Sequence, residues 1–343
     1  MKNHLRLTFI PALLAGGFLA APAAQAVPAP ADYQVTATYA VGGAGGWDYL
    51  TVDAAHHLLF VPRSTHMLVL DATNGRTVAD IPGQQRNHGV ALVPAAGRGF
   101  ITDGKDGSVV VFDLKTYAVR GKIKAAPDAD GTIYDSASNR VLVVAGDAGT
   151  LVAIAPGVDL KTGHADAAVE LGGKPEFLAC DGQGKAYVNL VDQNQVAVVD
   201  TRTMQVLQHW STAPGGAPVG MAIDRAHHRL FIGCRKPAKL IVMNADNGRI
   251  VADLPIGSGV DATAFDGEAL ASCGDGTVTV VRETAPDKFA VVQTVHTAPG
   301  ARTMGVDELT HTIYLPTADL VQEPGKRRPT AQPGSFKILV VSR

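Results

Sequence analysis

The sequence is poor in three kinds of residue, and each shortage excludes a class of protein. Only three of its 343 residues are cysteine, 6% are aromatic and 18% are charged, against 46% that are hydrophobic. A small and odd number of cysteines excludes a fold held together by a full disulfide framework. So low a charged fraction beside so many hydrophobic residues excludes a disordered chain. With few aromatic residues, small aliphatic side chains must fill the core.

The sequence also lacks the short motifs of several enzyme classes. No G-x-S-x-G, C-x-x-C-H, H-E-x-x-H, phosphate-binding loop or dinucleotide fingerprint occurs in a context that would support it. This disfavours a haem protein and an enzyme with a covalent nucleophile.

The first 26 residues have the pattern of a secretory signal peptide. Lys2 and Arg6 precede the apolar stretch Leu7–Ala21, and Ala24-Gln25-Ala26 matches a cleavage site. A membrane anchor is the alternative, but the apolar stretch is short for a span of about 20 residues. We therefore expect cleavage after Ala26, a linker at 27–32, and a periplasmic or secreted protein of a bacterial type with no membrane span after cleavage.

The rest of the chain repeats one unit, of which residues 47–83 are a good example. Four short runs rich in Val, Leu, Ile and Phe alternate with polar turns, as in an antiparallel sheet. The residues that end the first run of each copy recur at intervals of about 41 to 46, the period of a propeller blade. They are Asp53, Val93-Pro94, Asp135, Asp181, Asp224, Asp266 and Asp307.

The third runs give the same count of seven, from MLVLD at 67–71 to ILVVS at 338–342. The sequence therefore predicts an all-β fold: one seven-bladed β-propeller domain over residues 33–343, with four-stranded antiparallel blades. The chain ends before the last blade has a fourth strand. We expect Tyr33–Val41 to supply that strand and close the ring, which removes free sheet edges. Residues 319–335 form an insertion in blade seven, expected as a mobile loop.

The repeat resembles the YVTN-type β-propellers, the group often called YncE-like. VVVFD- and VAVVD-type third strands and Asn-Gly turns carry the likeness over the whole mature chain, and GGWDYLTVD, KPEFLACDGQGKAYVN and GMAIDRAHHRLFIGC resemble motifs of an exported bacterial subgroup. The resemblance implies a seven-bladed propeller that binds or scaffolds, with nucleic-acid binding suggested for some members. Without residues 1–26 the chain has 28 basic and 32 acidic residues, so its charge gives no reason to expect a nucleic acid. We expect a monomer.

Cys234 and Cys273 occupy matching positions at the ends of second strands in adjacent blades. An export signal permits a disulfide, but matched positions in neighbouring blades lie far apart for a Cα–Cα distance under about 7 Å. We expect buried free thiols.

Polar residues recur where the first strand of each blade begins. We count back five residues from the residue that ends the first strand of each blade. The residue found there is ionisable in six of the seven blades, and in blade five it is Val219. The ionisable residues are Asp48, His88, Asp130, Glu176, Asp261 and Arg302. Because first strands line the axis of a propeller, these side chains should converge at one mouth of the channel, with Trp47 beside them as an apolar surface. Arg302 is the one certain cation of this set.

Three interpretations of this ring remain open. It is a solvated channel mouth, a site for a small molecule or protein partner, or a metal site. Asp48, His88, Glu176 and Asp261 are the candidate ligands for Ca²⁺, Mg²⁺, Mn²⁺ or Zn²⁺. We expect an exported binding or scaffold protein with an acidic ligand-binding mouth. The alternative is a metal-dependent, lactonase-like hydrolase with His88 as its acid–base group.

Overall fold

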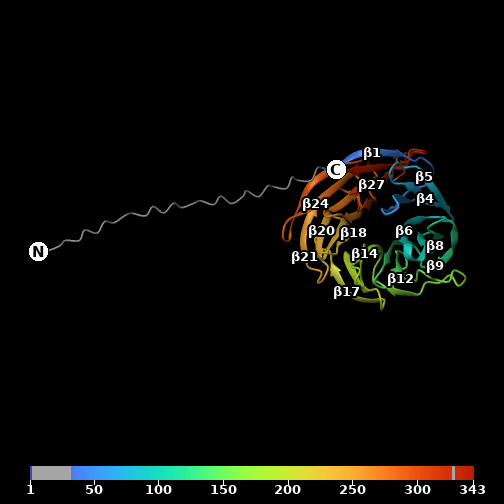
Figure 1. Cartoon of the computed structure of the whole chain (residues 1–343), viewed down its shortest axis with the longest axis horizontal. Helices are drawn as coiled ribbons and strands as arrows, with labels where there is room; N and C mark the ends of the chain where they lie inside the picture. The colour runs from blue at the N-terminus through green and yellow to red at the C-terminus, as the bar shows by residue number, and fades with distance from the viewer. Residues whose placement is uncertain (2–31, 327–328) are drawn as a thin grey trace. The chain divides into compact units, whose positions relative to one another are not determined.

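The seven sequence repeats fold into seven four-stranded antiparallel sheets arranged as the blades of a ring (Figure 1). The computed structural model describes residue 1, residues 32–326 and residues 329–343. The predicted signal peptide and most of the linker lie outside the described residues. First strands of neighbouring blades contact one another along the axis, as the sequence interpretation requires.

Blades one to three follow chain order from the axis outward. Their strands are β2 (Thr51–Asp53), β3 (Leu58–Pro62), β4 (His66–Asp71) and β5 (Thr77–Pro82); β6 (Asn87–Val93), β7 (Arg98–Asp103), β8 (Ser108–Asp113) and β9 (Val119–Lys124); β10 (Ala129–Asp135), β11 (Arg140–Ala145), β12 (Thr150–Ile154) and β13 (Ala167–Glu170). A single 3₁₀ turn, Pro94–Ala96, is the helical structure among the described residues.

Blades four to six repeat that order. Their strands are β14 (Pro175–Cys180), β15 (Lys185–Leu190), β16 (Gln195–Asp200) and β17 (Gln205–Ser211); β18 (Pro218–Asp224), β19 (Arg229–Arg235), β20 (Ala238–Asn244) and β21 (Ile250–Pro255); β22 (Val260–Phe265), β23 (Ala269–Cys273), β24 (Thr277–Ala285) and β25 (Lys288–His296).

The N-terminal strand closes the ring, as predicted. Blade seven contains β26 (Gly305–Asp307), β27 (Thr312–Thr317), β30 (Lys337–Ser342) and, as its outermost strand, β1 (Gln34–Ala40). Strand β1 runs antiparallel to β30, with Gln34 opposite Ser342 and Ala40 opposite Lys337 (Figure 1). Strand β1 also contacts blade one: the Tyr39 hydroxyl donates a hydrogen bond to the Ala72 carbonyl at 2.9 Å. Closure thus pairs an edge that the C-terminal strand would otherwise expose.

The core lies between blades and is mostly aliphatic. Second and third strands are buried almost throughout, as in SVVVFD of β8, because both faces of a blade pack on neighbours. Fourth strands are mostly exposed: in β9 only Ile123 is buried, and Val119 faces solvent. The cysteines are buried free thiols, which agrees with the expectation for Cys234 and Cys273.

The first strands share an irregularity at the end where the polar residues lie. The pairing register with the second strand shifts near the start of β6, β10, β14, β18 and β22, for example between Ala129 and Thr132. Such bulges turn a side chain away from the regular alternation of a strand. His88, Asp130, Glu176, Val219 and Asp261 each lie within one of these shifts.

The blade-seven insertion has more structure than a loop. Leu320–Val321 (β28) pairs antiparallel with Thr330–Ala331 (β29) in a two-stranded ladder. The insertion predicted at 319–335 thus contains a short two-stranded ladder, while residues 327–328 lie outside the described part. No helix in the described part of the chain is long and apolar enough to cross a membrane.

Candidate functional site at the channel mouth

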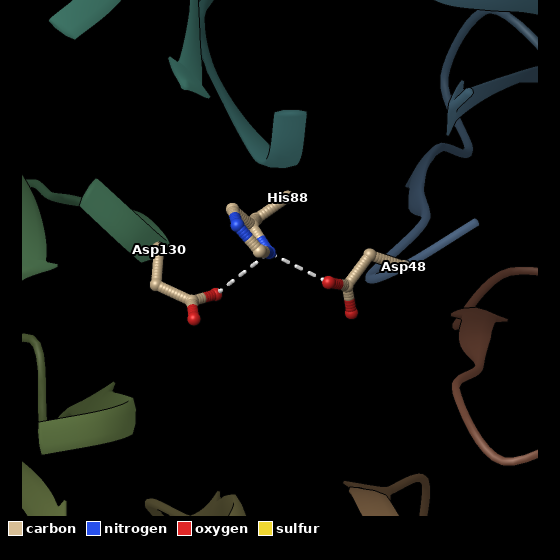
Figure 2. A group of neighbouring side chains, drawn as sticks. All are labelled: Asp48, His88 and Asp130. Atoms are coloured by element: carbon tan, nitrogen blue, oxygen red, sulfur yellow. Dashed lines mark hydrogen bonds and ion pairs between the residues drawn. The ribbon is translucent and has the colours of Figure 1, made fainter. Parts of the chain in front are cut away.

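His88 lies between carboxylates from the two neighbouring blades. Its Nδ1 is 2.7 Å from Oδ2 of Asp48, just before β2, and 3.4 Å from Oδ1 of Asp130, on β10 (Figure 2). A β-carbon on Gly104 would be 2.7 Å from His88 Nε2, so only glycine leaves room for the imidazole there. Three blades, distant in sequence, thus build one Asp–His–Asp group.

The other half of the mouth is an arginine–carboxylate network. Asp261, which is 5% exposed, accepts hydrogen bonds from both Arg235 and Arg302. The Arg235 guanidinium also lies 3.9 Å from a carboxylate oxygen of Glu176. The expectation that Arg302 would be the one cation was therefore wrong, since Arg235 supplies a second guanidinium.

Electrostatics keep His88 protonated at neutral pH. Burial lowers the pKa of its imidazole, but the hydrogen bond to Asp48 and the charges of Asp130 and Asp48 outweigh burial and raise the pKa to about 9. His88 is thus a third cation of the mouth. Against four carboxylates, the three cations leave one negative charge in excess when all groups are ionised.

Burial is the main influence on the pKa values of the carboxylates, and neighbouring negative charges add to it. Burial raises the pKa of Asp48, although the hydrogen bond to His88 opposes this. Burial raises the pKa of Asp130 further, and its neighbours Asp48 and Glu176 add to the effect. Burial also raises the pKa of Glu176, against the attraction of Arg235. Because crowded like charges disfavour ionisation, an added cation would be stabilised at this mouth.

A second cluster of charges consists of Arg86, Lys174 and Asp128, and Asp128 lies close to Asp130 in the sequence. Asp128 accepts a hydrogen bond from Arg86, and its other oxygen lies 3.6 Å from Lys174 Nζ. Arg86 and Lys174 are about half exposed. Lys174 Nζ also lies 3.0 Å from Asp147. The exposed ends of Arg86 and Lys174 place positive charge near the buried Asp–His–Asp group, so an incoming ligand could contact both signs of charge.

Three ligand atoms for a metal ion come together on one side of the mouth. Donor atoms of Asp48, His88 and Asp130 all lie within 4.8 Å of one another. This set shares Asp48 and His88 with the predicted ligands but contains Asp130 in place of Glu176 and Asp261. Glu176 and Asp261 instead face the two arginines. Two carboxylates and an imidazole suit Mn²⁺ or Zn²⁺ better than Ca²⁺, which prefers oxygen ligands alone.

Val219 and Trp47 lie apart from these polar contacts. Val219 is fully buried in the core between blades five and six. The Trp47 ring packs on Phe336, with ring centroids 5.7 Å apart, and lines a different cavity.

Sequence inspection missed two residues of the mouth, Arg235 and Tyr49. Arg235 ends the second strand β19, so a comparison of first strands could not find it. The sequence feature that could have indicated Arg235 is a charged residue at the end of an otherwise apolar strand, RLFIGCR. Burial raises the pKa of Tyr49 well above its ordinary value of 10, and the charges of Asp261, Glu176, Asp130 and Asp48 raise it further. The Tyr49 hydroxyl, which is neutral, is thus influenced by all four carboxylates. Its position next to Asp48 in the sequence could have indicated that it belongs to the mouth.

A scan against protein-family models finds no match to this chain, and a search of curated proteins finds no relative. The resemblance to YVTN-type propellers therefore extends to the seven-bladed fold and has no support from these comparisons beyond it.

Proposed function

We propose that this chain is an exported binding protein whose ligand site is the charged channel mouth. The observation that carries the proposal is the Asp48–His88–Asp130 group. Its His88 Nε2 is buried without a hydrogen-bond partner among the described residues, and Asp130 Oδ1, which accepts no hydrogen bond, has the 3.4 Å ion pair with His88 Nδ1. Buried polar atoms are normally paired, so unpaired ones here are available to a ligand. A scaffold that used only its outer edges would have no need of them.

The favoured ligand is a divalent transition-metal ion, alone or carrying a small anionic molecule. Asp48, His88 and Asp130 would hold the ion, and Arg86 and Lys174 lie beside them to contact an anion. A metal ligand must be deprotonated. Because the pKa of His88 is about 9 without metal, affinity should rise as pH increases from 6 to 9.

Metal titration of the mature protein tests this proposal. We expect one Mn²⁺ or Zn²⁺ per chain by calorimetry after chelator treatment, and a loss of affinity of about a hundred-fold or more in Asp130→Asn and His88→Gln. Asp80→Asn, on the exposed outer strand β5, is the matched control and should bind as the parent does. No stoichiometric metal, or equal binding by His88→Gln, would exclude the metal site.

A metal-dependent hydrolase is the second candidate, favoured by the same three-ligand group. A bound ion would polarise a carbonyl oxygen or activate water, and the carboxylate of Glu176, whose pKa is raised, would be the group to accept a proton. Hydrolysis of a panel of lactones, with metal and with chelator, separates the candidates. Turnover that the chelator abolishes favours the hydrolase, while metal binding without turnover favours the binding protein.

Export is a separate part of the proposal, supported by the sequence of residues 1–26. Expression of the full chain in a bacterium should give a periplasmic or secreted protein whose N-terminus is Val27. A cytoplasmic, uncleaved product would contradict it.

A further inference from the structure

A second unexplained charge lies away from the channel mouth, in the core between blades seven and one. The Arg63 side chain follows β3 and the whole residue is 1% exposed. Its Nη2 donates to the Ala44 carbonyl at 2.8 Å, and its guanidinium carbon lies 3.5 Å from the centre of the Phe336 ring. These two contacts account for one nitrogen and one face of the guanidinium.

The remaining donors of Arg63 have no acceptor. Nε and Nη1 are buried without a hydrogen-bond partner among the described residues, and so is Nε1 of Trp47 nearby. None of the ion pairs of the described chain includes Arg63. Burial lowers the pKa of Arg63 to about 10, so it still carries its charge at neutral pH. A buried charge is ordinarily paired.

Arg63 and Trp47, the residues that carry these donors, line a cavity of about 370 Å³, a volume within the range of small-molecule sites. Its walls include Trp47, Phe336 and Ala318, and Ala331 and Pro333 lie at an exposed rim. Gly43, Ala44 and Gly45 form another wall. Gly45 has φ +97°, and a β-carbon there would be 2.3 Å from the Arg63 carbonyl oxygen, so glycine is required for the chain to lie against Arg63.

The charge balance of the cavity selects the kind of ligand. Arg63 is the one charged residue among its described lining residues. A monoanion would neutralise it, whereas a phosphate dianion would leave a negative charge in a largely apolar cavity. Two aromatic rings and alanine side chains favour a ligand with an apolar body.

We propose that this cavity binds a small organic monocarboxylate. Its carboxylate accepts hydrogen bonds from Arg63 and from Trp47 Nε1, and its apolar part lies against Trp47 and Phe336. The site is independent of the channel mouth, because none of the metal-binding candidates lines the cavity.

Trp47 fluorescence provides the test, with benzoate as the probe. The chain has two tryptophans, so Trp210→Phe leaves Trp47 as the single reporter. We expect a saturable change in emission with benzoate, and weaker or no saturation with the neutral isostere benzamide and with inorganic phosphate. In the same background, Arg63→Gln should weaken benzoate binding by about ten-fold or more, since a charge-assisted hydrogen bond is lost. Arg98→Gln, which removes a partly buried arginine elsewhere, is the control and should not change it.

Equal responses to benzoate and benzamide, or unchanged benzoate affinity in Arg63→Gln, would overturn the proposal. Should Arg63→Gln fail to fold, Ala331→Phe fills the cavity from its exposed rim without altering the core. That variant should fold and lose benzoate binding by about ten-fold or more. A folded Ala331→Phe protein with the parent's affinity would also overturn it.

Discussion

The protonation of His88 should make the stability of the metal-free protein fall at alkaline pH. Its pKa in the folded state, about 9, exceeds the ordinary value of 6.5. The interactions of the imidazolium with Asp48 and Asp130 therefore stabilise the fold fully below pH 6.5, and that contribution is lost as pH rises through about 9.

The size of this effect follows from the difference between the two pKa values. At ~1.4 kcal/mol per pH unit, a change from 6.5 to about 9 corresponds to about 3 kcal/mol. Solvent screening reduces this free energy only slightly, because the His88 side chain is 14% exposed. For a domain of this length, 3 kcal/mol is about 5 °C in Tm.

Two measurements check the prediction after chelator treatment. NMR titration of the imidazole resonance, assigned with His88→Gln, should give a pKa near 9. Urea unfolding should show a loss of about 2.5 kcal/mol between pH 7 and 10 that His88→Gln lacks. A His88 resonance that titrates near 6.5, or a stability difference between parent and variant that is flat over this range, would refute the electrostatic reasoning.

Three further predictions follow from the packing. Deleting residues 32–40 exposes the β30 edge and should cause aggregation or a large drop in Tm; a monomeric protein with unchanged Tm, by light scattering and calorimetry, would contradict the closure argument. Limited trypsin digestion should cut first after Lys326, which is exposed on the blade-seven insertion, and mass spectrometry identifying an earlier cut within a blade would count against it. Gly104→Ala places a methyl group against the imidazole of His88, so it should weaken Mn²⁺ or Zn²⁺ binding about ten-fold with little loss of fold; equal metal affinity by calorimetry would argue against His88 as a ligand.

Much of the fold could be predicted from local residue patterns. Strands and turns depend on neighbours in sequence, so a repeat of about 41 to 46 residues gave seven blades, and the missing last strand led to Tyr33–Val41 as the closing strand. The start of the first strand could also be identified as polar in six of the seven blades, because the same position recurs in each repeat. The two-stranded ladder of the insertion could not, since β28 and β29 are only two residues each and are stabilised by each other.

The composition of the site depended on contacts that no local pattern encodes. Sequence alone determined that Asp48, His88, Asp130, Glu176, Asp261 and Arg302 belong to one end of the ring. Only the tertiary structure decided that His88 pairs with Asp48 and Asp130, and that Arg235 from a second strand joins Asp261. The physical reason is that bulges reorient the first-strand side chains, and the curvature of the ring then brings some neighbours into contact and keeps others apart.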